Sequence, residues 1–403
     1  MNLLAVRVYN LSENHQFNKR MKAMKQRTAL LGFALAAVVT ATAQEKIESP
    51  IVSEKDFVWY AEQKAAWQDV VRQNPQDETA WLNYYNAARY MAWHHEEDST
   101  ARQVVGEMEA AITDSYTFNY CAYRESVSGK GYGDADVYAE AALTRLPARM
   151  EFFDYDQWVC YLAMKGDEAR MKPLAKRYFD SGIYSEDVLR YSYNELQGMD
   201  EGGIFLGTGD VAVIPKWLIQ EGMGAHRDKT IVCVPFLVVK EYREWLFRKL
   251  GVELPALKEI TCAEDYDANQ VTLINAIVGK YGRKVYFSPM HYRADNVWKN
   301  NLYNEGLLLR YSPKPYDNLS VKRRNVEERY LMEYLLVSFH PDWTAGQVLS
   351  VNYAVVLADL LPYYARHDRK RYDWLMRLLV SAVQNTTMTD EQKQLYLKLL
   401  IEK

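Results

Sequence analysis

The sequence predicts three folded parts: an α-solenoid of helical hairpins, a small α/β domain with a parallel sheet, and a C-terminal helical region. Apolar residues recur at helical spacing from Phe57 to about Leu196, and again from Val326 to Ile401. Between Gly202 and Tyr311, short apolar runs alternate with helical segments. These observations place the three parts at residues 50–200, 201–315 and 316–403, after a leader at 1–43.

The first part has residues that end and begin helices at the positions expected of helical hairpins. Val58, Ala61 and Ala65 share one helix face, and Asn74-Pro75 ends that helix. Asp77 then caps a second helix. Pro147 follows Pro75 by 72 positions, about twice the roughly 34-residue period of tetratricopeptide repeats. The expected architecture is therefore a tetratricopeptide-like array.

The middle part reads as βαβ units. Strands are expected at 204–207, 230–234, 284–288 and 306–311, and helices at 213–223, 238–250 and 271–281. This alternation predicts a mostly parallel, Rossmann-like sheet with helices on both faces. The tail returns to helix at 326–339, 348–364, 372–384 and 390–401.

Composition excludes several classes of protein. The chain of 403 residues is 49% hydrophobic with a formal net charge of −4, which rules out intrinsic disorder and binding to nucleic acid through bulk positive charge. Aromatic residues are abundant, with 31 Tyr and 10 Trp. Most are expected to pack between helices, and a concave subset exposed to solvent would form a surface for a glycan or peptide.

The first 43 residues have the order of an export signal. A basic start at Met24-Lys25 precedes an apolar run from Ala29 to Val39 and an Ala-x-Ala site that ends at Ala43. Met21 or Met24 is then the true start, and the alternative is an uncleaved anchor. Cleavage after Ala43 leaves 43 basic and 52 acidic residues, a net charge of −9. No later apolar stretch is expected to reach the length of a membrane span, so the sequence predicts a soluble periplasmic protein.

Four cysteines remain in the mature chain, at Cys121, Cys160, Cys233 and Cys262. An oxidising compartment permits disulfides, and Cys121–Cys160 and Cys233–Cys262 are the pairings within single domains. Four buried thiols are the equally weighted alternative.

The turn after the first strand is the strongest candidate for a ligand site. Thr208, Gly209 and Asp210 lie where a parallel strand gives way to a helix, the place where open α/β sheets bind ligands. The turn lacks the spacing of a dinucleotide or phosphate loop, so no cofactor is expected. The alternative is structural: Asp210 caps its own helix.

Two further residues are weak catalytic candidates beside Asp210. His291 follows the third strand and shares the sheet edge of Asp210 if the strands are parallel, and Arg227 precedes the second strand. The His94-His95-Glu96-Glu97 run lacks the spacing of a metal site, and no metal is expected.

The α/β segment also carries a family resemblance. The stretches 205–210, 215–222, 227–232, 284–287, 304–311 and 316–318 resemble the soluble C-terminal region of a family of large bacterial multi-pass membrane proteins. That family is described as of unknown function or as similar to protein O-mannosyltransferases. This chain has Val211-Ala212-Val213 after Asp210, where the family's acidic turn continues. The resemblance implies an extracytoplasmic accessory domain.

Together these observations predict a non-catalytic binding, scaffold or accessory protein of the cell envelope that recognises a protein, a peptide or a glycan. One alternative is an envelope carbohydrate-active enzyme that uses Asp210. A second is a helper subunit of a membrane glycosyltransferase. Neither a nucleic-acid partner nor a membrane span in the mature chain is expected.

Overall fold

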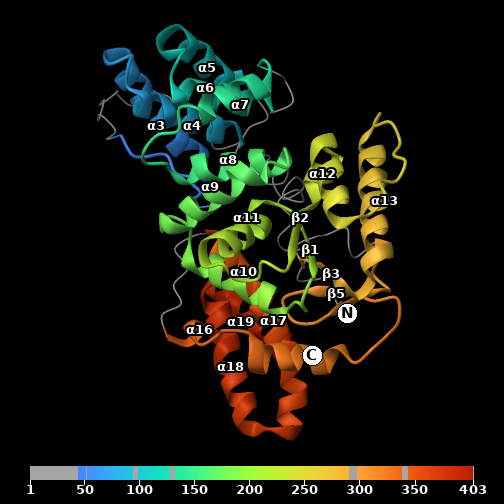
Figure 1. Cartoon of the computed structure of the whole chain (residues 1–403). Helices are drawn as coiled ribbons and strands as arrows, with labels where there is room; N and C mark the ends of the chain where they lie inside the picture. The colour runs from blue at the N-terminus through green and yellow to red at the C-terminus, as the bar shows by residue number, and fades with distance from the viewer. Residues whose placement is uncertain are drawn as a thin grey trace. The chain divides into compact units, whose positions relative to one another are not determined.

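The computed structural model describes residues 44–50, 52–93, 99–127, 132–289, 297–337 and 344–402 (Figure 1). The predicted leader, the His94–Glu97 run and His291 lie outside these ranges. The described residues form two compact units, one within 44–48 and 55–138 and one within 49–54 and 139–402.

The first unit consists of helices in hairpin order, as predicted. They are α3 (Phe57–Gln73), α4 (Glu78–Trp93), α5 (Ser99–Ile112), α6 (Tyr116–Ser126) and the start of α7 (Ala135–Leu143). Side-chain caps fix where they begin: Asp56 accepts from Trp59 N at 2.9 Å, and Asp77 accepts from Ala80 N at 3.0 Å. Asn74 is the C-cap of α3, so the predicted Asn-Pro stop is confirmed.

The aromatic residues of this unit fill its core. Tyr85 is fully buried and donates to Glu125 Oε1 at 2.7 Å, and Arg89 pairs with the same carboxylate at 3.0 Å. The guanidinium of Arg124, also buried, lies 5.5 Å from the ring centre of Tyr120. The packing role predicted for most aromatics is thus what these residues have.

The second unit is built on a five-stranded sheet with strand order β2-β1-β3-β5-β4. The strands are β1 (Ile204–Gly207), β2 (Thr230–Cys233), β3 (Val285–Phe287), β4 (Leu302–Asn304) and β5 (Leu309–Tyr311). The first three are parallel, as predicted, but β5 and β4 are antiparallel. The sheet is therefore mixed rather than mostly parallel, because a hairpin of three-residue strands extends its edge.

Helices cover both faces of the sheet. Figure 1 shows α10 (Glu186–Gly198) and α11 (Asp210–Leu218) on one side, and α12 (Lys240–Leu250) and α13 (Ala263–Tyr281) on the other. Gly251 and Gly282 have positive φ and end α12 and α13 as expected. A π-helix, η1 (Ile219–Met223), continues α11.

Helices α8 (Phe152–Met164), α9 (Glu168–Asp180) and α10 belong to the same compact unit as the sheet. The sequence predicts them in the first domain, because the helical spacing of apolar residues continues through them from the preceding helices. Their apolar faces pack on α11, η1 and α12 instead.

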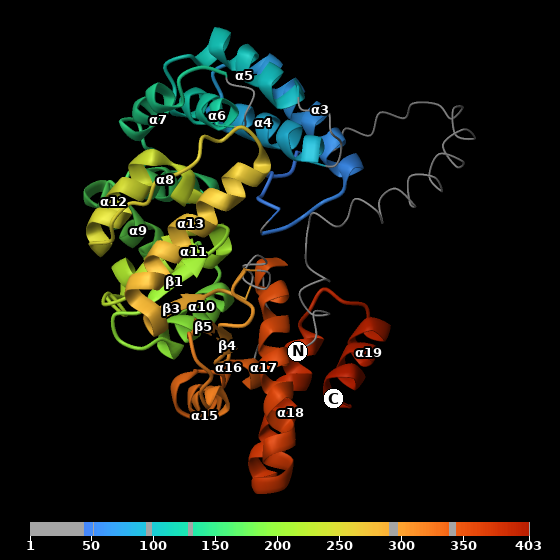
Figure 2. The ribbon, with the colours of Figure 1, turned by 90° about the vertical axis from the view of Figure 1, so that its right-hand side faces the viewer.

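The tail forms α15 (Asn318–Arg324), a π-helix η4 (Asn325–Arg329), α16 (Tyr334–Val337), α17 (Thr344–His367), α18 (Arg369–Gln384) and α19 (Asp390–Ile401). The last three pack together (Figure 2) and confirm the predicted helices there. The predicted helix at 326–339 is wrong as one unit, since residues 330–333 are not helical.

One described helix is long and apolar enough to cross a membrane, contrary to the expectation that none would be. It is Ala345–His367 within α17, and 61% of its apolar window is buried inside the protein. A core helix meets the same two criteria, so length and composition do not distinguish the two roles.

Candidate functional site

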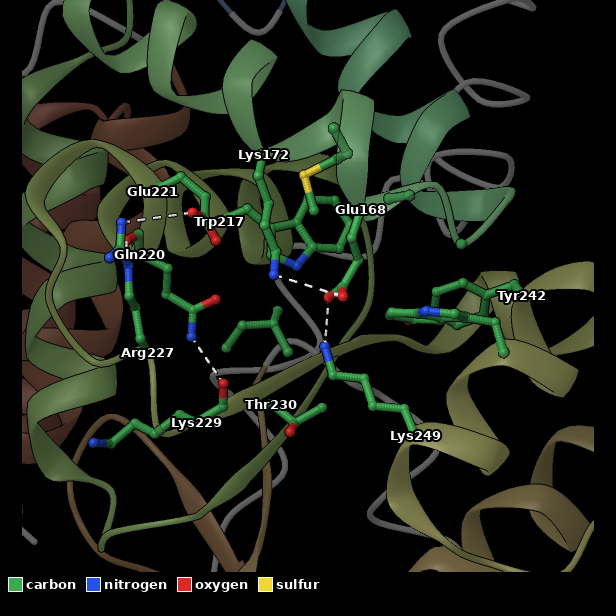
Figure 3. Close-up of a pocket in the computed structure, with 15 residues that line it drawn as sticks. Glu168, Lys172, Trp217, Gln220, Glu221, Arg227, Lys229, Thr230, Tyr242 and Lys249 are labelled. Carbon is green, nitrogen blue, oxygen red and sulfur yellow. Dashed lines mark hydrogen bonds and ion pairs between the residues drawn. The ribbon is translucent and has the colours of Figure 1, made fainter.

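A pocket of about 340 Å³ opens in the second unit beside the edge strand β2 (Figure 3). Helix α9 lines one side with Glu168 and Lys172, and α12 lines another with Trp245 and Lys249. Trp217 of α11 and the η1 π-helix complete the wall. The volume lies within the range of small-molecule sites.

Aromatic rings form the apolar part of this pocket. Trp217 and Tyr242 are buried, whereas Trp245 is half-buried and offers ring surface. The rings of Tyr242 and Trp245 lie 5.5 Å apart. The Tyr242 hydroxyl accepts from the backbone N–H of Cys233 at 3.0 Å, which ties α12 to the end of β2.

A glycine allows the indole of Trp245 to pack closely against the backbone of a turn. Gly166, in the turn between α8 and α9, has φ +68°, and a Cβ added there would lie 2.6 Å from Trp245 Cγ. The turn therefore needs glycine twice, once for its backbone conformation and once for the close approach of the indole.

Replacing Gly166 with alanine is expected to displace Trp245 and to lower the free energy of unfolding by about 2 kcal/mol, measured by denaturant titration. Gly182→Ala is the matched control. Its φ is +67°, but nothing lies within 4 Å of the added Cβ, so only backbone strain of about 1 kcal/mol applies. Equal losses in the two variants would contradict the packing role of Gly166.

Ionic groups form the polar part of the pocket. Glu168 Oε1 lies 2.5 Å from Lys249 Nζ, and Glu168 Oε2 lies 3.6 Å from Lys172 Nζ. The carboxylate is thus shared by two ammonium groups that come from different helices. The ammonium of Lys249 also lies 4.9 Å from the ring centre of Trp245. Figure 3 shows the three charged groups converging on the cavity.

These contacts keep Glu168 ionised. Burial alone would raise the pKa of its carboxyl, but the hydrogen bond and charge of Lys249, with the charge of Lys172, outweigh burial and hold the pKa below its usual value. The triad therefore carries two positive charges and one negative charge at neutral pH. The net positive charge of the triad favours binding of an anionic group on a ligand. The two ammonium groups can also donate hydrogen bonds to ligand hydroxyl groups, and the Glu168 carboxylate can accept them.

The η1 π-helix supplies the opposite wall. Gln220 Nε2 donates to the carbonyl oxygens of His226 and Lys229, at 2.8 Å each, and so holds the loop before β2. Arg227 Nε donates to the Gln220 carbonyl oxygen at 2.8 Å, and its guanidinium lies 3.7 Å from Glu221. π-Helical turns frequently occur at functional sites, because they redirect side chains.

The predicted Asp210 turn lies elsewhere. Gly209 is the N-cap of α11, and Asp210 is the first residue of the helix and is exposed. The Cys160 thiol donates to Asp210 Oδ1 at 3.9 Å. Burial, and next the charges of Asp210 and Asp156, raises the pKa of Cys160 well above its usual value. These surroundings favour the protonated thiol over the thiolate.

Asp210 and Arg227 are not brought together. Asp210 follows the carboxyl end of β1, whereas Arg227 precedes Thr230, which pairs with Ile204 at the start of β1. They therefore lie at opposite ends of the parallel strand pair. Of the predicted site residues that the structure describes, Arg227 alone lines the pocket, and Thr208 and Gly209 stay at the strand end with Asp210.

The four cysteines are free thiols in the structure. Cys121 and Cys233 are buried, Cys160 is half-buried, and Cys262 is exposed. The residues that the structure describes contain no group of three metal-ligating side chains.

Apart from Arg227, the lining residues were not among the predicted site residues, and the four that form the ionic group and the indole wall are Glu168, Lys172, Trp245 and Lys249. Each helix contributes two of them at i, i+4 spacing, so that both face the pocket. The spacing was readable in the sequence. On one helix, however, it equally indicates a solvated ion pair, and only the packing of α9, α11 and α12 distinguishes the two.

Comparisons of the chain with protein-family models, with curated proteins and with solved structures gave no match. The resemblance of residues 204–318 to the multi-pass membrane protein family thus stays a prediction.

Proposed function

We propose that this protein is a non-catalytic binding protein of the bacterial cell envelope, and that the pocket beside β2 binds a saccharide. Export through a leader cleaved after Ala43 is part of the proposal. The observation that carries it is the presence, side by side in one cavity, of the Trp245 ring and the Lys172–Glu168–Lys249 triad.

Both halves of the pocket suit a sugar. The apolar face of a pyranose ring packs on an aromatic ring, while its hydroxyl groups need donors and acceptors around the edge. Lysine ammonium groups donate, and the Glu168 carboxylate accepts. Because the triad has an excess positive charge, an acidic sugar is favoured over a neutral one.

The enzyme alternative is less well supported. General acid–base chemistry at Asp210 needs a second ionisable group within reach. The group found at 3.9 Å is the Cys160 thiol, whose raised pKa keeps it protonated. His291 lies outside the described residues and contributes nothing to the argument.

The finer architecture is also proposed. The α3–α4 hairpin, with its capped and proline-stopped helices, supports a tetratricopeptide-like first unit. The parallel order β2-β1-β3, with α11 following β1, supports a Rossmann-like second unit. In both, rigid helices would present binding surfaces, which is consistent with an accessory role beside an envelope enzyme.

Calorimetric titration with a neutral hexose, an N-acetylhexosamine, a hexuronic acid and a hexose phosphate tests the proposal. Binding is expected, tightest for the two acidic sugars. Trp245→Ala removes a buried aromatic contact of about 1.5–3 kcal/mol, so affinity should fall about 10- to 100-fold.

Trp59→Ala is the matched control, since Trp59 is also half-buried but lies on α3 in the first unit. It should leave the affinity unchanged. Lys249→Ala should remove the preference for acidic sugars. If none of the four sugars binds at millimolar concentration, or if Trp245→Ala binds as well as the unmodified chain, the saccharide proposal is wrong.

A further inference from the structure

The chain holds one of its own extended segments against a helical hairpin in the first unit. Residues 44–48 have no helix or strand structure and lie along α3 and α4. In Figure 1 this segment is part of the dark blue coil that precedes α3. Its contacts have the pattern of a peptide bound to a receptor.

Side chains of the hairpin hydrogen-bond the backbone of the segment. Glu45 N donates to Gln63 Oε1 at 2.8 Å, and Ile47 N donates to Asn83 Oδ1 at 2.8 Å. The indole Nε1 of Trp67 donates to the carbonyl oxygen of Glu45 at 2.9 Å. The bonded N–H groups are two residues apart, as they are on one side of an extended chain.

The two amides are built into the hairpin. Gln63 is 1% exposed and Asn83 is 6% exposed. The Asn83 amide is oriented by a bond from its Nδ2 to the Thr79 carbonyl oxygen at 2.8 Å, which leaves Oδ1 directed at the segment. Without a peptide backbone in this place, both amides would lose a partner.

Only one side chain of the segment is buried against the hairpin. Ile47 is 1% exposed, whereas Glu45, Lys46 and Glu48 are exposed. The hairpin therefore recognises a backbone in extended conformation and one large aliphatic side chain. The sequence on either side of that residue is largely unconstrained.

We propose that the α3–α4 face, defined by Gln63, Trp67 and Asn83, is a binding site for extended peptides, and that residues 44–48 are its resident occupant. The partner is a peptide segment with a large aliphatic residue two positions after a backbone N–H bonded to Gln63. Such a peptide reproduces all three bonds and the buried side chain, and it displaces the resident segment.

Displacement is physically reasonable because the resident segment is weakly held. Three hydrogen bonds and one buried isoleucine outweigh the loss of backbone freedom in five residues by only a modest margin. Tethering in cis supplies a high effective concentration rather than a strong contact. This site is separate from the saccharide pocket, so the peptide proposal does not depend on the saccharide proposal.

The test uses a fluorescent peptide of residues 44–48 with blocked ends, and the full chain in two forms. Ile47→Asp places a charge in the buried position and should empty the site. The peptide should then bind the Ile47→Asp chain at least tenfold more tightly than the unmodified chain. A second chain, with residues 44–48 replaced by alternating Gly and Ser, covers the case that Ile47→Asp misfolds.

Two modified peptides make the test specific. N-methylation at Ile47 removes only the donor to Asn83 and should abolish binding. N-methylation at Glu48 should not, because successive N–H groups of an extended chain alternate in direction. Polarisation of the peptide fluorescence is the readout. No binding to either emptied chain at millimolar peptide, or equal effects of the two methylations, would overturn the proposal.

Discussion

Replacing Lys216 with methionine is expected to lower the free energy of unfolding by about 3–5 kcal/mol. Lys216 Nζ lies 2.5 Å from Glu195 Oε2, and the two side chains are 0% and 2% exposed. Without the ammonium group, the buried Glu195 carboxyl on α10 loses its ionic partner in the core.

The surroundings of Lys216 explain why the loss is large. Its ammonium also donates to the Ala212 carbonyl oxygen at 2.7 Å and lies 4.2 Å from the ring centre of Phe205 on β1. Burial lowers the pKa of Lys216 and raises that of Glu195, in each case against the attraction between the two charges. The pair thus joins α10, α11 and the sheet at a single point.

Denaturant unfolding measures this effect against two controls. Lys216→Met combined with Glu195→Leu removes both charges and should recover most of the loss. Lys176→Met breaks an exposed i, i+4 pair with Asp180, whose side chains are 56% and 53% exposed, and should cost less than about 1 kcal/mol. If Lys216→Met is no worse than Lys176→Met, the buried pair is not what stabilises α11.

Local structure was largely predictable from the sequence. Caps such as Asp77 and Thr389, and stops such as Gly251, fix helix ends through backbone groups within a few residues, so single positions carry the signal. Of the hairpin β4–β5, β5 falls within the strand predicted at 306–311, whereas β4 carried no such signal. Both strands have three residues each, and β4 is half-exposed throughout, so no alternation marks it.

The candidate site was predictable only in part. The strand-end rule directed attention to Asp210, but the pocket opens at the other end of β2, where Arg227 lies. Its walls come from α9, η1 and α12, which are far apart in the sequence. Their mutual placement depends on how the helices pack on the sheet, and helix-face spacing alone does not encode that.

The motif residues that carried the family resemblance have mainly structural roles. Lys216 forms the buried pair with Glu195, and Asp228 accepts from Gly202 N at 3.0 Å ahead of β1. Lys216, a charged residue within an apolar run, was therefore the signal of a buried ion pair. Glu305 and Arg310 are a second pair of charged residues that meet in the interior of the protein.

Arg310→Met is the second change expected to have a large effect, a loss of about 3–5 kcal/mol in the free energy of unfolding. Arg310 Nε lies 2.9 Å from Glu305 Oε2, and Glu305 is fully buried. Its Nη2 lies 2.6 Å from Asp200, and its guanidinium lies 4.6 Å from the ring centre of Tyr286, its cross-strand partner. The substitution leaves the buried Glu305 carboxylate without its arginine partner, close to where β3 and β5 pair.

Thermal and denaturant unfolding of three further variants separate the contacts of this network. Asp200→Asn removes the half-exposed partner and should cost less than about 1 kcal/mol. Tyr316→Phe deletes the 2.6 Å bond to Glu305 Oε1 and should cost about 1–2 kcal/mol. Arg310→Lys keeps the charge but loses the planar fork, so it should fall between these losses and that of Arg310→Met. If Arg310→Lys is as damaging as Arg310→Met, geometry rather than charge compensation holds the antiparallel strands in place.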